Sequence, residues 1–153
     1  MRKSRLGIAL LAFALASGAM MPALAKVPAV YVNPKNHLAI SGYDPVAYFT
    51  QAKPVAGDAR FTANYQGATW RFASAANRDA FVKNPQAYAP QFGGYCALAV
   101  SEGATAKTEP ENWKIVDGKL YLNYSDEAQE IWEKDIPGHI ALGQKNWPAV
   151  LEK

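Results

Sequence analysis

Few side chains after residue 25 can bind a soft or borderline metal ion. They are one cysteine, Cys96, and two histidines, His37 and His139, because every methionine lies before that point. Two imidazoles and a thiolate are a ligand set for a trigonal copper site or a zinc site. The residue types therefore predict a copper or zinc site made of Cys96, His139 and His37. The alternative is that His37 is an ordinary residue at the start of a strand and His139 one at the start of a helix.

Cys96 is unpaired within the chain, and its chemistry has several interpretations. An odd cysteine in an exported protein indicates a free thiol, a metal ligand or a disulfide to another chain. If the residues after it form a helix, the helix N-terminus lowers the pKa of the thiol. The opposite interpretation is a small side chain packed under the helix. A thiol enzyme using His139 and Asp135 beside Cys96 is a third, weaker hypothesis.

Aromatic residues are abundant, with four Trp, eight Tyr and six Phe. They could line a pocket for a small ligand, even a flat macrocycle such as haem with an axial His or Cys. At strand and helix spacings such rings more often form the core, since each buries a large apolar area. The sequence leaves both uses open.

The first 25 residues have the layout of a cleavable signal peptide. Arg2, Lys3 and Arg5 precede an apolar run from Leu6 to Ala19, and Ala23-Leu24-Ala25 forms the cleavage pattern. The apolar run is shorter than the roughly 20 residues that span a bilayer. We therefore expect a periplasmic or secreted protein, without stable membrane insertion once the signal is cleaved.

Charge and length limit the possible functions of the remaining chain. Of 16 basic and 13 acidic residues, three basic residues and no acidic residue lie before residue 26, which leaves 13 of each sign. A formally neutral chain does not favour nucleic acid as a partner. The remaining length suits one domain. We expect an extended leader over residues 26–36 and a single domain over residues 37–153.

Turn and cap signals divide this domain into strands and helices. Gln66-Gly67 and Asp117-Gly118 indicate two hairpins, and Ser74 and Ser125 are candidate helix caps. The expected strands cover residues 37–40, 61–65, 68–72, 113–116 and 119–123, and the expected helices cover 46–49, 75–83, 95–101, 125–134 and a last helix after Pro137-Gly138 to residue 150. The order does not alternate as in βαβ units, so the predicted fold class is α+β, a small antiparallel sheet covered by several helices.

The chain resembles the YHS domain family in several motifs. These are Phe72-Ala73-Ser74 followed by Asn77, Phe81, Asn84-Pro85 and Tyr88, with Gly42-Tyr43-Asp44-Pro45, Gly93-Gly94-Tyr95-Cys96 and Asn146-Trp147-Pro148 around them. The resemblance covers roughly residues 37 to 150. It implies a YHS-like fold of the exported bacterial type. YHS domains occur in copper-transporting ATPases, and the family's two cysteines are presumed metal ligands. Here those positions hold Ala73 and Asn77, so the resemblance does not carry that site over.

The sequence as a whole predicts an exported YHS-domain binding protein that is not an enzyme. Its partner would be a metal ion, copper or zinc, or a small ligand, with Cys96 and the histidines contributing. The alternative is an interaction module that docks on a larger exported partner protein through its aromatic and Gly-rich surface. An exposed apolar patch of several hundred Å² would favour that alternative.

Overall fold

The computed structural model describes residues 27–153, so the predicted signal peptide lies outside the described residues. This part of the chain forms an α+β fold with six α-helices and two separate two-stranded antiparallel sheets. The elements are α1 (Ala47–Thr50), β1 (Asp58–Tyr65), β2 (Ala68–Phe72), α2 (Ala75–Lys83), α3 (Pro85–Tyr88), α4 (Ala97–Ser101), β3 (Trp113–Val116), β4 (Lys119–Leu122), α5 (Asp126–Glu133) and α6 (Ile136–Asn146). The α+β class is confirmed, with the strands divided between two hairpins. No helix within residues 27–153 is long and apolar enough to cross a membrane.

Both predicted hairpins are present, and their turns explain why. Asp117 and Gly118 have φ values of 50° and 71°, and Gln66 and Gly67 have 49° and 77°. A two-residue turn with positive φ at both positions matches the twist of the strands that it joins. β3 pairs with β4 from Trp113 opposite Leu122 to Val116 opposite Lys119. β1 is longer than predicted and contains an irregularity between Asp58 and Thr62.

Helices α2 and α5 begin at the predicted serine caps. The Ser74 hydroxyl accepts a hydrogen bond from the Asn77 amide at 3.1 Å, and the Ser125 hydroxyl accepts one from the Ala128 amide at 3.2 Å. Each cap satisfies an amide that the helix itself leaves unpaired. α2 ends at Lys83 because Pro85 follows shortly after. The starts of these two helices can therefore be predicted from local sequence.

Two predicted elements are wrong. Residues 37–40 do not form a strand: Leu38 and Ala39 make only isolated bridges, and Ile40 begins a single 3₁₀ turn, Ile40–Gly42, with φ of 46°. Pro137-Gly138 does not separate two helices but lies inside the first turn of α6. Asp135 caps α6 by accepting from the Gly138 amide at 3.0 Å, and proline is well tolerated in a first turn.

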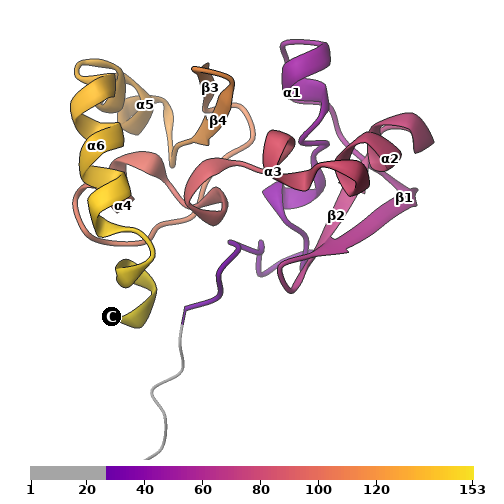
Figure 1. Cartoon of the computed structure of the whole chain (residues 1–153), viewed down its shortest axis with the longest axis horizontal. Coiled ribbons are helices and arrows are strands. Elements are labelled where there is room, and N and C mark those ends of the chain that lie inside the picture. The colour runs from indigo at the N-terminus through magenta and orange to yellow at the C-terminus, as the bar shows by residue number, and fades with distance from the viewer. Residues whose placement is uncertain (1–26) are drawn as a thin grey trace, which may run out of the picture.

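The core consists of two clusters of buried side chains. The N-terminal cluster lies around β1, β2 and α2 and is centred on Trp70, Phe72 and Phe81. The C-terminal cluster lies around α4, α5 and α6 and includes Val100 and Trp132. Figure 1 shows the two groups of elements on opposite sides of the molecule, with α3 between them.

Strand β4 lies between the two clusters. Leu120 and Leu122 belong to the N-terminal cluster, whereas Tyr121 belongs to the C-terminal cluster. All three are at most 2% exposed. Successive side chains of a strand point to opposite faces, so β4 can contribute to both cores only because it is buried on both sides. The first residue of β4, Lys119, is exposed at the edge of this shared strand.

Candidate functional site

The structure places the three predicted metal ligands in different surroundings. His37 is exposed, with φ of 59°, in a turn where its amide donates to the Asn33 carbonyl. Cys96 is buried directly before α4, and His139 is half-buried on α6. Within residues 27–153, no three or more histidine, cysteine, aspartate or glutamate side chains are grouped so that they could hold a metal ion. The metal site stays a prediction without a preformed cluster behind it.

Cys96 is a packed thiol in the C-terminal cluster, with 2% of its surface exposed. Its Sγ lies 3.5 Å from Oδ1 of Asn123, which is itself fully buried and also accepts from the Leu98 amide. Burial raises the pKa of the Cys96 thiol, although nearby backbone hydrogen bonds act in the opposite direction. The predicted position at a helix N-terminus is confirmed, but the expected lowering of the pKa is wrong because desolvation outweighs it.

His139 is held by Ser101 rather than by Cys96. Its Nδ1 lies 2.9 Å from the Ser101 hydroxyl, and that hydroxyl lies 2.6 Å from the Leu98 carbonyl. Because the serine has one proton and gives it to the carbonyl, Nδ1 of His139 is the donor to Ser101. The carboxylate of Asp135 is engaged as the cap of α6. The three residues of the thiol-enzyme hypothesis therefore each have a separate structural partner.

The positions of the two YHS cysteines meet at a buried carboxylate. Asp44 is fully buried, and its Oδ2 accepts from the Ala73 amide at 2.8 Å and from Nδ2 of Asn77 at 2.7 Å. Its Oδ1 accepts from the amides of Val46 and Ala47 at the start of α1. Four donors compensate the loss of hydration of this carboxylate. Asp44 and Asn77 thus join α1 to the start of α2.

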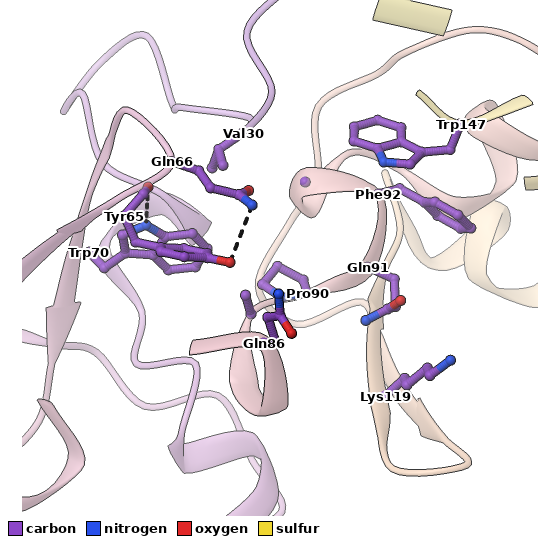
Figure 2. Close-up of a pocket in the computed structure, with 12 residues that line it drawn as sticks. Val30, Tyr65, Gln66, Trp70, Gln86, Pro90, Gln91, Phe92, Lys119 and Trp147 are labelled. Atoms are coloured by element: carbon purple, nitrogen blue, oxygen red, sulfur yellow. Dashed lines mark hydrogen bonds between the residues drawn. The ribbon is translucent and has the colours of Figure 1, made fainter. Parts of the chain in front are cut away.

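A pocket of about 370 Å³ opens between the two core clusters. Figure 2 shows Tyr65 and Trp70 on one side and Phe92 and Trp147 on the other, with Gln86 and Pro90 between them. The lining residues are Val30, Tyr65, Gln66, Trp70, Gln86, Ala89, Pro90, Gln91, Phe92, Gly93, Lys119 and Trp147. The volume lies within the range of small-molecule sites, which are commonly formed where two structural units meet.

The aromatic walls of the pocket are fixed by their own contacts. The indole Nε1 of Trp70 donates to the Tyr65 carbonyl at 3.1 Å, and the two rings lie 6.3 Å apart. On the opposite wall, Trp147 lies 6.0 Å from Phe92 and 6.3 Å from Tyr95. Rings held in this way present apolar faces without having to be ordered by a ligand. The described residues that line the pocket include no histidine, cysteine or methionine, so they provide no axial ligand for haem.

The segment that leads into the domain closes one side of the pocket. The Tyr31 amide donates to the Gly93 carbonyl at 2.9 Å, and the Tyr95 hydroxyl donates to the Pro28 carbonyl at 2.8 Å. A Cβ on Gly93 would lie 1.9 Å from the Ala29 carbonyl oxygen, so the close approach requires glycine. Val30 thereby lines the pocket, although the leader was predicted only as an extended segment.

The sequence indicates that aromatic residues could line a pocket, but not where in the fold the pocket lies. The abundance of aromatic residues indicates that a pocket is possible but not which rings line it, and Gly93 belongs only to one of the YHS-like motifs. The polar lining residues Gln86, Gln91 and Lys119 carried no signal, because single polar residues in short helices and turns are ordinary surface residues. Only the packing of the two clusters shows that they face the same space.

No protein-family model, no curated protein and no solved structure matches this chain. The likeness to the YHS domain therefore rests on the sequence motifs described above. The site has to be interpreted from its own geometry.

Proposed function

We propose that this chain is an exported, YHS-like binding protein, without catalytic activity, that holds a small organic ligand in the pocket between its two core clusters. The observation that carries this proposal is the pocket itself, about 370 Å³ in volume, with ordered aromatic rings on both walls. Sites for small organic molecules combine aromatic walls with polar groups that orient the ligand. The polar residues of this pocket are Gln66, Gln86, Gln91 and Lys119. Export is supported by the signal-peptide pattern before residue 26.

The other two hypotheses have less support. A copper or zinc site would have to be assembled from an exposed His37, a buried Cys96 and a His139 bonded to Ser101. A docking module would present an apolar patch, and the large exposed apolar side chains are Val82, Tyr124, Ile131 and Leu142, from four different segments. Apolar residues exposed singly are normal on a protein surface. Both hypotheses stay predictions.

The test fills the pocket from an exposed position. Gln86 and Ala87 are neighbouring exposed residues of α3, but only Gln86 lines the pocket. A set of small ring compounds at millimolar concentration is screened against the purified protein by saturation-transfer NMR. We expect some of them to bind, Gln86→Trp to abolish that binding, and Ala87→Trp to preserve it.

Two results would contradict the proposal. One is that no ring compound in the set binds to the wild-type protein. The other is that compounds bind equally to Gln86→Trp, which would place them outside this pocket. Equal melting temperatures of the two variants would show that a difference in binding does not come from unfolding.

A further inference from the structure

Among the described residues that line the pocket, Lys119 is the one that carries a charge. This lysine follows the Asp117-Gly118 turn at the start of β4, where the strand is fixed between the two clusters. Its side chain is exposed, and no described residue pairs with its ammonium group. Asp117, the nearest acidic residue along the chain, does not line the pocket. A lysine left without a carboxylate partner at a pocket with aromatic walls is available to an anion from solution.

Two glutamine side chains that line the same pocket are also without hydrogen-bond partners among the described residues. They are Gln86 on α3 and Gln91 in the turn after it, and Figure 2 shows their amide groups facing one another across the pocket. Gln66, by contrast, already donates to the Tyr65 hydroxyl at 3.2 Å. Each free amide offers two N–H donors and one acceptor. The polar side of the pocket is therefore rich in donors and carries one positive charge.

Resting on the function proposed above, we propose that the ligand is a small ring compound that carries one carboxylate. The ring lies between the aromatic walls of Tyr65 and Trp147, and the carboxylate lies on the side of the pocket where Figure 2 shows Gln91 and Lys119, from which it accepts hydrogen bonds. One lysine balances one negative charge. A phosphate dianion would bring a second charge for which the pocket holds no cation, and a cationic ligand would meet Lys119 with the same sign.

The volume limits the size of such a ligand. At about 370 Å³, the pocket lies near the small end of the range of small-molecule sites, which is roughly 300–1,000 Å³. This is enough for one or two fused rings with a short acidic side chain. Indole-3-acetate is a suitable probe of this size and charge, indole-3-acetamide is its neutral counterpart, and tryptamine its cationic one.

The experiment measures the affinity of these three probes by isothermal titration calorimetry. We expect the wild-type protein to bind indole-3-acetate about five- to tenfold more tightly than indole-3-acetamide, as one charge-assisted contact provides. Tryptamine should bind more weakly than the amide. Lys119→Met should reduce the affinity for indole-3-acetate to that for indole-3-acetamide, and it should leave the affinity for indole-3-acetamide unchanged. Lys53→Met, at another exposed lysine that does not line the pocket, should change neither.

The outcomes separate this inference from the function on which it rests. If all three probes bind equally, or if Lys119→Met weakens the acid and the amide alike, the carboxylate assignment is wrong while the pocket stays a ligand site. If no probe binds and Gln86→Trp changes nothing, both proposals are wrong. A preference for the acid that disappears at high salt in the wild type and is absent in Lys119→Met supports an ionic contact.

Discussion

The buried Asp44 carboxylate allows the sharpest test of the structure, through its partner Asn77. The amide of Asn77 donates to Oδ2 of Asp44 at 2.7 Å, and Asp44 is fully buried in the native fold. We predict that Asn77→Ala destabilises the protein by leaving this oxygen with the Ala73 amide as its one remaining donor. The change is small in volume, so most of its effect comes from the lost hydrogen bond.

The magnitude follows from two opposing terms. A hydrogen bond to a charged group contributes about 1.5–3 kcal/mol, and its loss destabilises the fold. Alanine in place of asparagine in a helix returns up to about 0.7 kcal/mol through its higher helix propensity. The net cost is therefore about 1–2 kcal/mol, which for a chain of this length lowers the melting temperature by about 3–10 °C. Asp44→Ala should cost more, about 3–5 kcal/mol, because it leaves four donors unpaired.

The assay is urea unfolding followed by circular dichroism, with Asp79→Ala as the control. Asp79 lies on the same helix, is 67% exposed and pairs only with the neighbouring Arg78. Its removal should change the free energy of unfolding by less than about 0.5 kcal/mol. The double variant Asp44→Ala/Asn77→Ala completes a double-mutant cycle, in which the effect of Asn77→Ala should almost vanish once Asp44 is absent.

The reasoning is refuted if Asn77→Ala is as stable as Asp79→Ala. It is also refuted if Asn77→Ala costs the same with and without Asp44, since the two side chains would then act independently. Should Asp44→Ala fail to fold, the comparison of Asn77→Ala with Asp79→Ala still decides the matter.

Three further predictions concern the thiol, metals and the leader. Burial raises the pKa of the Cys96 thiol, so its contribution to stability is retained below the ordinary thiol pKa of about 9 and falls as the pH rises above it. Above pH 9 the wild-type protein should therefore lose unfolding free energy faster than Cys96→Ala, and parallel curves for the two proteins would contradict this. Titration with Cu(I), Cu(II) or Zn(II) should leave the melting temperature unchanged. A melting temperature that rises with metal in the wild-type protein, but not in Cys96→Ser or in the double alanine variant of the two histidines, would instead establish the metal site. Gly93→Ala should destabilise the protein by well over about 1 kcal/mol, because the added Cβ meets the Ala29 carbonyl. Gly67→Ala, also at positive φ but in open space, should cost about 1 kcal/mol. Equal losses of stability in thermal denaturation would show that the contact with the leader is dispensable.

The elements predicted correctly are those specified by local chemistry. The Asp117-Gly118 and Gln66-Gly67 turns and the Ser74 and Ser125 caps act within a few residues, so the sequence shows them directly. Residues 37–40 look like a strand because they are apolar, yet their backbone is set by packing against β2, which no local pattern records. Pro137-Gly138 looks like a break, but Asp135 two residues earlier converts it into a helix start.

The site was harder to predict because it depends on contacts between distant segments. The Cys96 thiol was singled out for its rarity, and its burial beside Asn123 follows from residues 27 positions away. The partners of the Asp44 Oδ2 atom come from residues 29 and 33 positions later in the chain. The pocket combines a leader residue, two hairpins and the C-terminal Trp147, none of which has an unusual local pattern.

The residues at positions 73 and 77, where the YHS resemblance would place cysteines, suit the buried Asp44 carboxylate rather than a metal ion. Two thiolates at positions 73 and 77 beside the Asp44 carboxylate would place three negative charges together, which is stable only with a bound cation. Here the backbone amide of Ala73 and the side-chain amide of Asn77 supply donors instead, and the carboxylate is satisfied without a metal. This region is thereby closed as a binding site and serves to join α1 to α2. The polar groups that remain without partners in the described residues around the pocket, Lys119, Gln86 and Gln91, lie elsewhere, between the two clusters. Unpaired donors beside ordered aromatic walls are the observation on which we base the proposal of an organic anion as the ligand.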